Sequence, residues 1–312
     1  MNRRVRWIVG VAVSIGMLAV LPSAAVAKAG LPTYPNAILY SASGWAWRMS
    51  PNGTHRAKLA LSPSFDATVW SPDHSRIAYV HVGKKGATTV WTVAANGKHA
   101  AQIRYSRPWR GWTSGHAEGD LAWSPDGRCI IYSDTSPTSD GLTQDYMVVI
   151  DLKRHTSRKL APAMSEGQHV WGLRYMPDGK HILEWEDVAA AGWMRLIRVS
   201  NGQSGAQIDG TDSIGSADVS PNGKQLVCSV RDIDTGVNEL KVMSADGSDQ
   251  TVLRTDANDA RYLAASPWWS PDGSRIVYGN FDTDTSRAHI TVIKADGTGA
   301  VSLGLGIPTS WQ

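Results

Sequence analysis

The sequence predicts an all-β fold: a six-bladed β-propeller whose blades are four-stranded antiparallel sheets. Two observations predict it, a short turn phrase that recurs five times and a second hairpin signal that falls between the copies. A repeat of about 50 residues is typical of propellers, solenoids and arrays. Each copy of the phrase is a variation on Trp-Ser-Pro-Asp-Gly, and its prolines are Pro72, Pro125, Pro177, Pro221 and Pro271.

Each copy of the phrase has the chemistry of a tight turn between two strands. Proline presets its own φ, Asp or Asn tolerates turn geometry, and glycine supplies a positive φ. The residues that follow alternate between apolar and polar, as at Ile77 and Tyr79 or Ile276 and Tyr278, which is strand periodicity. The aromatic ring that precedes most copies ends the strand before it and can pack between neighbouring sheets.

The second signal is a hairpin in which Asn-Gly or Asp-Gly joins two apolar runs. Such dipeptides between alternating apolar runs are the strongest short-range hairpin signals. The chain carries six hairpins, one of them a longer variant, but only five turn phrases. They lie at residues 50–53, 95–98, 151–155, 200–203, 245–248 and 295–298.

The two ends of the chain together complete a sixth blade. Residues 307–312 look like the strand that leads into a turn phrase, and residues 37–61 supply the other three strands. We expect the C-terminal strand to join the N-terminal blade, because this closes the ring and removes a free sheet edge. Six blades then have roughly 46 residues each, which suits a propeller.

The first 27 residues have the pattern of a cleaved export signal. Three arginines precede an apolar run over residues 7–21, and Ala-Val-Ala at residues 25–27 fits a signal-peptidase site. The alternative is an uncleaved anchor, but a run of about 15 apolar residues is shorter than the roughly 20 that span a bilayer. We therefore expect a protein that is secreted or held in the periplasm or cell envelope. The expected division is a signal peptide at residues 1–27, a short segment at 28–36 and the propeller at 37–312.

Charge and cysteine content exclude several function classes. Of the 31 Lys and Arg, three lie in residues 1–27, so the rest balance the 28 Asp and Glu and no basic surface indicates nucleic acid. No later apolar stretch is long enough to cross a membrane. We also expect a monomer. Cys129 and Cys228 fall in non-adjacent repeats, which favours two small buried thiols over a disulfide, because a disulfide needs Cα atoms within about 7 Å.

The turn phrase, followed about 20 residues later by an Ala-Asp-Gly hairpin, resembles the PD40 (WD40-like) repeat of TolB-type propellers. The resemblance covers about residues 37–312. It implies a propeller fold and is specific for little else, because propellers host many functions. TolB carries an additional N-terminal α/β domain for which we expect no room here, so partners that depend on that domain are not carried over. The function expected from the resemblance and the composition is a scaffold that binds a protein, a peptide or a cell-envelope glycan.

The longest link between blades is the candidate binding surface. In a propeller, the links between blades share one face with the loops that join the second and third strands, whereas the Ser-Pro-Asp-Gly turns lie on the opposite face. The link at residues 105–119 combines aromatic rings with Arg and His, a mixture that can bind a sugar ring, a peptide or another protein. The alternative is that these tryptophans cap the blade interfaces. The candidate ligand-binding residues are Trp109, Arg110, Trp112, His116, His169 and Trp171.

Paired carboxylates in loops after the second strand of a blade form a weaker candidate for a metal site. Asp232 and Asp234, and Asp282 and Asp284, alternate in a way that can bind calcium, which takes six to eight oxygen ligands. None of these stretches has the spacing of a known calcium loop. Solvated turn residues or an acidic channel mouth is the alternative.

Evidence for catalysis in the sequence is thin. The sequence lacks a Gly-x-Ser-x-Gly elbow, a His-Glu-x-x-His motif and paired-cysteine zinc spacings, so we assign no catalytic residue. The competing hypothesis is a metal-dependent carbohydrate lyase or hydrolase. Its metal ligands would be His116, Gln168 and His169.

Overall fold

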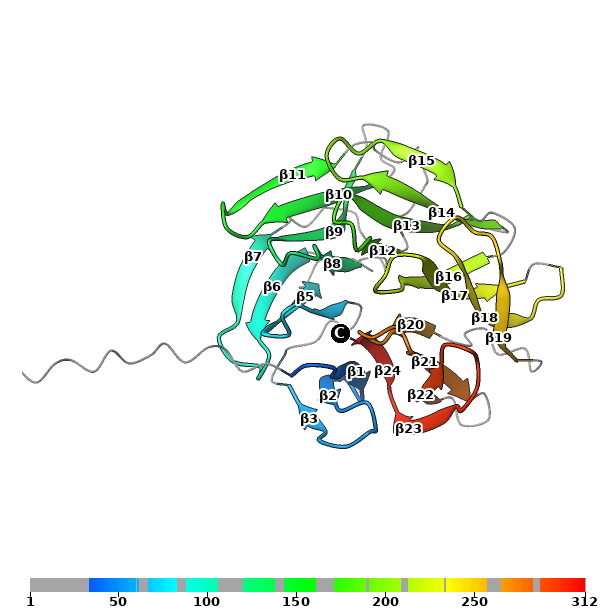
Figure 1. Cartoon of the computed structure of the whole chain (residues 1–312). Helices are drawn as coiled ribbons and strands as arrows, with labels where there is room; N and C mark the ends of the chain where they lie inside the picture. The colour runs from blue at the N-terminus through cyan, green and yellow to red at the C-terminus, as the bar shows by residue number, and fades with distance from the viewer. Residues whose placement is uncertain are drawn as a thin grey trace, which may run out of the picture. The chain divides into compact units, whose positions relative to one another are not determined.

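The structure is a computed structural model, and the residues that it describes form six four-stranded antiparallel sheets with no helix among them. The innermost strands contact one another in a closed circle, and the sheets stand around it as the blades of a propeller (Figure 1). The predicted fold class is confirmed. The described residues are 34–59, 61, 67–82, 88–105, 120–137, 143–160, 170, 172–188, 191–208, 213–232, 234–256, 265–282 and 287–311.

The first three blades contain strands from the two ends of the chain and from its first half. Blade 1 consists of β24 (Ile307–Trp311), β1 (Ile38–Ala42), β2 (Trp45–Met49) and β3 (Ala57–Lys58). Blade 2 consists of β4 (Thr68–Trp70), β5 (Arg76–Val82), β6 (Thr88–Ala94) and β7 (Ala101–Tyr105). Blade 3 consists of β8 (Leu121–Trp123), β9 (Cys129–Pro137), β10 (Thr143–Asp151) and β11 (Thr156–Leu160).

The second half of the chain forms the other three blades in sequence order, each from its innermost strand outward. Blade 4 consists of β12 (Gly172–Tyr175), β13 (His181–Val188), β14 (Ala191–Arg198) and β15 (Ser204–Gln207). Blade 5 consists of β16 (Ser213–Val219), β17 (Gln225–Arg231), β18 (Asn238–Ser244) and β19 (Thr251–Asp256). Blade 6 consists of β20 (Ala265–Trp269), β21 (Arg275–Asp282), β22 (Arg287–Lys294) and β23 (Val301–Leu305).

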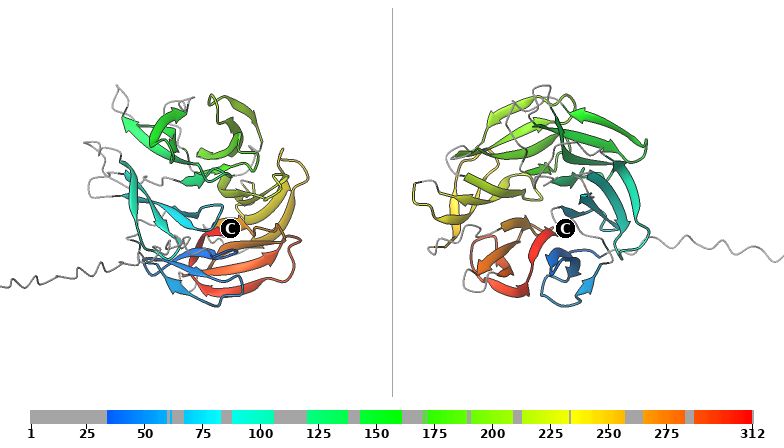
Figure 2. Two further views of the ribbon diagram at one scale, coloured as in Figure 1. Left: turned by 60° about the vertical axis from the view of Figure 1, so that its left-hand side comes forward. Right: turned by 180° about the vertical axis from the view of Figure 1, so that it is seen from behind.

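The C-terminal strand β24 closes the ring by pairing with β1, as the two chain ends predict. Ile38 pairs with Trp311, and Leu39 pairs with Ser310. The red strand β24 lies beside the blue strand β1 in both Figure 1 and the view from behind in Figure 2. The Trp311 Nε1 also donates to Asn36 Oδ1 at 2.7 Å, so β24 is tied to the segment that precedes β1 as well as to β1 itself.

The turn phrase builds the same turn in four blades. Ser124 shows the pattern: its Oγ donates to Asp126 Oδ1 at 2.7 Å and accepts from the backbone N of Cys129 at 2.8 Å. Gly127 has a φ of 68°, and a Cβ there would lie 3.9 Å from Pro72 of the preceding blade. The turns therefore pack in series, each glycine beside the proline of the blade before it. The same serine contacts occur at Ser71, Ser220 and Ser270.

The core lies between the blades, where the aromatic rings at the start of the turn phrases pack. Trp70 is fully buried, and its Nε1 donates to the backbone O of Ala37 at 2.9 Å. Trp123 donates in the same way to the backbone O of Val69 of the preceding blade at 3.3 Å. Cys228 is buried and Cys129 half-buried, and the two do not form a disulfide, as predicted. Within the described ranges, no helix is long and apolar enough to span a bilayer.

Candidate functional site

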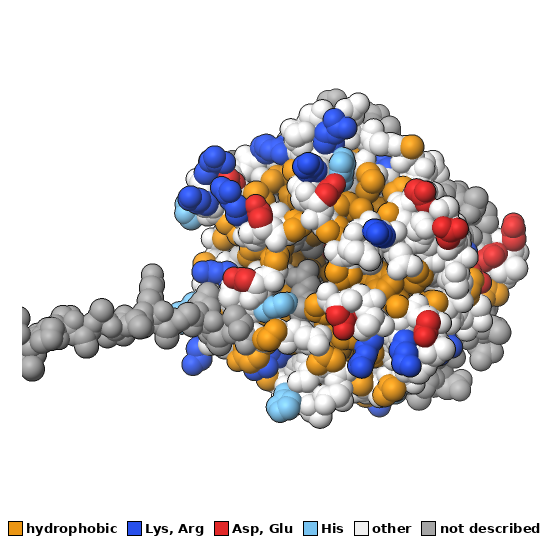
Figure 3. All heavy atoms as spheres, viewed as in Figure 1, with side chains coloured by type: hydrophobic (Ala, Val, Ile, Leu, Met, Phe, Trp, Pro, Cys, Tyr) orange, Lys and Arg blue, Asp and Glu red, His pale blue; other side chains and the backbone are white. Residues whose placement is uncertain are grey.

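In blades 2 to 6, the residue directly before the turn phrase lines a cavity beside the propeller axis. It is apolar in blades 2, 3 and 6, but it is Arg174 in blade 4 and Asp218 in blade 5. Figure 3 shows hydrophobic side chains gathered around a central hollow. The chemistry of this channel is therefore set by the exceptions to the repeat. The apolar residues at this position are Val69, Ala122 and Trp268, and the equivalent residue of blade 1, Ser310, is fully buried.

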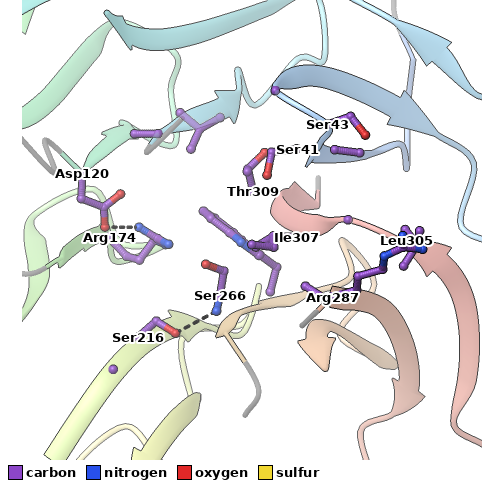
Figure 4. A pocket seen from close by; sticks show the side chains of 18 residues that line it. Ser41, Ser43, Asp120, Arg174, Ser216, Ser266, Arg287, Leu305, Ile307 and Thr309 are labelled. Carbon is purple, nitrogen blue, oxygen red and sulfur yellow. Dashed lines mark hydrogen bonds and ion pairs between the residues drawn. The ribbon is translucent and has the colours of Figure 1, made fainter. Parts of the chain in front are cut away.

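Arg174 connects four blades across the channel. Its Nη1 lies 2.7 Å from Asp120 Oδ2 of blade 3, as Figure 4 shows, and its Nε lies 3.6 Å from Asp218 Oδ1 of blade 5. Its guanidinium lies 3.9 Å from the ring centroid of Trp268 in blade 6. Arg174 is only 7 % exposed, so this network is a buried junction on the axis.

The two carboxylates of this junction also hold backbone groups of the next blade. Asp120 Oδ2 accepts from the backbone N of Leu173 at 3.0 Å, and Asp218 Oδ2 accepts from the backbone N of Trp269 at 2.8 Å. Breaking a buried ion pair by removing one partner costs about 3–5 kcal/mol, because a charge is left unpaired. The junction therefore fixes the inner strands of blades 3 to 6 relative to one another.

Burial raises the pKa of Asp218 to about 6, against the opposing effects of the Arg174 charge and the backbone N–H of Trp269. Asp218 is 9 % exposed and the Arg174 Nε is too distant for a hydrogen bond, so the ion pair offsets only part of the cost of losing water. The folded-state pKa lies above the usual value for Asp. The protonated form of Asp218 thus stabilises the folded chain at low pH.

Arg174 and Trp268 both line two cavities that meet at the axis. The first, which we call the loop-face cavity, has a volume of about 810 Å³ and opens at the strand ends away from the Ser-Pro-Asp-Gly turns. Hydroxyl groups dominate its polar wall, and Arg287 adds an exposed cation (Figure 4). A polar wall of this kind beside apolar side chains is typical of a ligand pocket. The hydroxyls belong to Ser41, Ser43, Ser216, Ser266 and Thr309.

The backbone of the loop-face cavity is held in unusual conformations. Ser266 has a φ of 53°, in the left-handed region, and its backbone N donates to Ser216 Oγ of the preceding blade at 3.1 Å. Gly306 has a φ of 138°, and a Cβ there would lie 2.8 Å from the backbone O of Ser41. Because strained or glycine-dependent backbone clusters at binding sites, this feature agrees with a functional role for the cavity.

The second cavity, which we call the turn-face cavity, has a volume of about 290 Å³ and is ringed by the five repeat prolines. Buried donors line it: the Nε1 atoms of Trp268 and Trp269 and the Nε of Arg174 have no hydrogen-bond partner among the described residues. In blade 2, His74 replaces the repeat glycine and adopts a φ of 55°. Unpaired buried donors need an acceptor, which water or a ligand can supply.

The residues that the sequence predicts as the ligand site lie outside the described residues. Trp109, Arg110, Trp112 and His116 fall between Tyr105, which ends β7, and Asp120, which lines the loop-face cavity. Their assignment stays a prediction.

His169 and Trp171 also fall outside the described residues, on either side of Val170. Val170 is buried, and its backbone N donates to Asp145 Oδ2 at 3.1 Å. The role of both neighbours stays a prediction, as does the pairing of His116 with Gln168 and His169.

Of the four acidic candidates for a metal site, some lie among the described residues and others do not. Asp232 Oδ1 accepts from the backbone N of Asp234 at 3.0 Å and of Thr235 at 2.8 Å, and these hydrogen bonds lower the pKa of Asp232. The side chain of Asp282 and the whole of Asp284 lie outside the described residues. No cluster of three or more His, Cys, Asp or Glu that could hold a metal occurs among the residues that were described. Calcium binding stays a prediction.

Sequence reasoning missed the axial junction of Asp120, Arg174 and Asp218. A signal for it exists, because aligning the five turn phrases places Arg174 and Asp218 at a position that is uncharged in the other copies. Without such an alignment, a single charged residue in a short strand looks like one of the polar residues that alternate with apolar ones in any strand.

Comparison with known proteins identifies relatives in structure only. No family model matches the sequence, and no curated protein matches it. TolB from Acinetobacter baumannii superposes with a TM-score of 0.64 at 18 % identity, covering 88 % of this chain and 65 % of that chain. This chain thus spans somewhat less than two thirds of that TolB.

Two further structures show how widely the architecture is used. A chain of a nidogen/laminin complex gives a TM-score of 0.62 at 9 % identity, covering 88 % of this chain and 97 % of that one. An oligogalacturonate lyase in complex with manganese gives a TM-score of 0.55 at 13 % identity, covering 88 % of this chain and 74 % of that one. At these identities the similarity shows the fold alone, that of a β-propeller.

Proposed function

We propose that this chain is an exported propeller of the PD40 repeat type that serves as a scaffold for a protein, a peptide or a cell-envelope glycan. The ligand enters the loop-face cavity, and Trp109 and Trp112 contribute to its binding. The observation that carries this proposal is the cavity itself: about 810 Å³ on the axis, floored by Arg174 and Trp268 and rimmed by hydroxyl groups and Arg287.

The chemistry of the cavity suits a neutral or anionic ligand with many hydrogen-bonding groups. Ser, Thr and backbone groups both donate and accept, and Arg287 adds a charge that has no carboxylate partner in the described part of the chain. Apolar contact comes from Trp268 and Ile307, so a peptide or a sugar ring finds both kinds of surface. The nidogen/laminin chain is a propeller within a protein complex, which supports a binding role for the architecture.

The export signal at residues 1–27 supports a location outside the cytoplasm. The structural likeness to TolB agrees with a role at the cell envelope. N-terminal sequencing of the protein recovered from cells tests this part, with a new terminus at Lys28 as the expected result. Recovery of the intact leader would contradict cleavage.

A thermal-shift screen of the mature protein against oligosaccharides, peptides and divalent ions, with and without chelator, tests the binding role. We expect at least one peptide or glycan to raise the Tm in the presence of chelator. Arg287→Ala should reduce that shift, whereas Arg198→Ala, on the exposed surface of β14, should preserve it. A shift that is equal in both variants would place the ligand elsewhere.

A second candidate function, a metal-dependent carbohydrate lyase or hydrolase, is favoured by the lyase among the similar structures. It requires His116, Gln168 and His169 to converge on one metal ion, since nitrogen ligands lie about 2 Å from a bound zinc ion. Manganese-dependent release of unsaturated products from acidic oligosaccharides, abolished by His116→Ala, would support it. Stabilisation by a glycan without turnover, with or without manganese, would favour the scaffold.

A further inference from the structure

A groove of about 850 Å³ lies between blades 2 and 3 on the face of the Ser-Pro-Asp-Gly turns, away from the loop-face cavity. One wall is formed by β7 and the turn of residues 71–76, and the other by the turn of residues 124–128 and the hairpin of residues 151–155. Lys and Arg side chains gather in Figure 3 over the region that Figure 1 assigns to β7 and β11. We call this feature the blade 2–3 groove.

Cations line both walls of the groove. Arg76 stands on the blade 2 wall, and Arg128 and Lys153 stand on the blade 3 wall. All three are exposed and have no carboxylate partner among the described residues. The adjoining hairpin and β11 add further basic side chains: residues 153–159 include five counting His155, of which Arg154 pairs with Asp151 at 3.0 Å.

The carboxylates of the groove are bound within their own turns. Asp126 accepts from Ser124 Oγ at 2.7 Å, and this hydrogen bond is the main reason that its pKa is lowered. Asp151 Oδ1 accepts from the backbone N of Lys153 and of Arg154 at 3.0 and 2.8 Å. These acids form the turns, so they do not neutralise the cations on the walls through direct pairs.

Arg104 places a further cation where the two blades meet. It extends from β7 of blade 2, and its Nε donates to Tyr132 Oη at 3.3 Å while its Nη1 donates to Ser157 Oγ at 3.1 Å, both in blade 3. Because two hydrogen bonds hold its guanidinium, little side-chain entropy remains to be lost when an anion binds. The groove is therefore prearranged as well as basic.

The floor of the groove is apolar. Ile150 and Trp123 are buried beneath it, and Ile103 and Leu152 are half-buried at its surface. A phosphate polymer or a lipid headgroup has no apolar group to place there. A peptide that alternates acidic and apolar side chains matches both the walls and the floor, since successive side chains of an extended chain point to opposite sides.

We propose that the blade 2–3 groove binds an extended acidic segment of a partner protein, in which carboxylates flank at least one apolar side chain. The carboxylates pair with Arg76 and Arg128, and the apolar side chain rests on Ile103 and Leu152. Basic side chains on an outer strand also discourage two copies from pairing edge to edge. Peptide binding and the prevention of pairing between copies follow from the same charges, but only peptide binding requires the apolar floor. This site is separate from the loop-face cavity and does not depend on it.

Fluorescence anisotropy with a labelled peptide of sequence Asp-Leu-Glu-Leu-Asp-Leu-Glu, which alternates acidic and apolar side chains, tests the proposal. The groove variant is Arg76→Gln with Arg128→Gln. The chain offers a matched control, Arg275→Gln with Lys224→Gln, which occupies the same two positions of the turn phrase in blades 6 and 5 and is also exposed. We expect the groove variant to weaken binding about fivefold or more and the control to change it less than about twofold.

Two further arms separate the alternatives. Replacing Leu by Ser in the peptide, or Leu152 by Ser in the protein, should also weaken binding, because the floor contributes. The proposal is overturned if the control variant weakens binding as much as the groove variant. It is equally overturned if inorganic polyphosphate of the same charge competes as well as the peptide and the Leu-to-Ser peptide binds unchanged. Self-association of the groove variant, with no peptide binding to the wild type, would show that the cations only keep copies apart.

Discussion

The guanidinium of Arg174 lies 3.9 Å from the ring centroid of Trp268, and the two residues come from blades 4 and 6 on opposite sides of blade 5. With Asp120 and Asp218 they form a polar and aromatic junction on the axis of a fold whose core consists of apolar side chains packed between neighbouring blades. Because Arg174 and Trp268 both line the loop-face and turn-face cavities, the junction is the shared floor of the two.

Arg174→Ala should destabilise the protein by about 3–5 kcal/mol, because it leaves two buried carboxylates without their cation. Urea denaturation at pH 7 measures the effect. Arg198→Ala provides the control, since an exposed substitution of this kind changes stability by about 0.5 kcal/mol or less. Equal midpoints for the two variants would show that the junction contributes nothing to stability.

The raised pKa of Asp218 predicts a dependence of stability on pH. The carboxyl is protonated in the folded chain below about pH 6 but only below about pH 4 when unfolded, so its stabilising contribution is present in acid and is lost as the pH rises through 6. We expect the unfolding free energy of the wild type, relative to Asp218→Asn, to fall by about 2–3 kcal/mol between pH 4 and pH 7. A constant difference across this range would contradict the shift.

Removal of β24 should open the ring. Deleting residues 307–312 removes the pairing of β24 with β1 and the burial of Trp311, which is 2 % exposed. The loss of a buried Trp alone costs about 3–5 kcal/mol, so we expect a large fall in Tm or failure to fold. Differential scanning calorimetry measures the change, and an unchanged Tm would disprove closure by this strand.

Substitutions at the glycine position of the turn phrase should change the stability in opposite directions in blades 2 and 3. His74 and Gly127 both have a positive φ, at 55° and 68°. His74→Gly removes the cost of a left-handed L-residue and should stabilise the protein by up to about 1 kcal/mol, after the entropy cost of glycine. Gly127→Ala should destabilise it by about 1 kcal/mol, because the nearest atom to its Cβ is 3.9 Å away and only the backbone is strained. The same sign for both would contradict this explanation.

The fold could be predicted because its signals are local. Ser124, Asp126 and Gly127 form their turn through hydrogen bonds within six residues, and this chemistry recurs wherever the phrase recurs. The closing pair of Ile38 with Trp311 follows from counting, since five turn phrases and six hairpins leave one blade to be shared between the chain ends.

The axial junction could not be predicted in the same way. Arg174 meets Asp120 and Trp268 at sequence separations of 54 and 94 residues, and their proximity depends on the circular order of the blades. Arg104 and Ser157 meet for the same reason, through the contact of β7 with the next blade. A sequence pattern shows which side chains are unusual, but the three-dimensional arrangement decides which of them come together.

Hydrogen exchange of the mature protein with and without a bound peptide or glycan tests whether the ligand binds in the loop-face cavity. We expect the ligand to slow amide exchange around this cavity, at Ser41 to Gly44 and at Gly306 to Thr309, and to leave the turns at residues 71–76 and 124–128 unchanged. Slower exchange confined to those turns, with no change around the loop-face cavity, would contradict binding in this cavity.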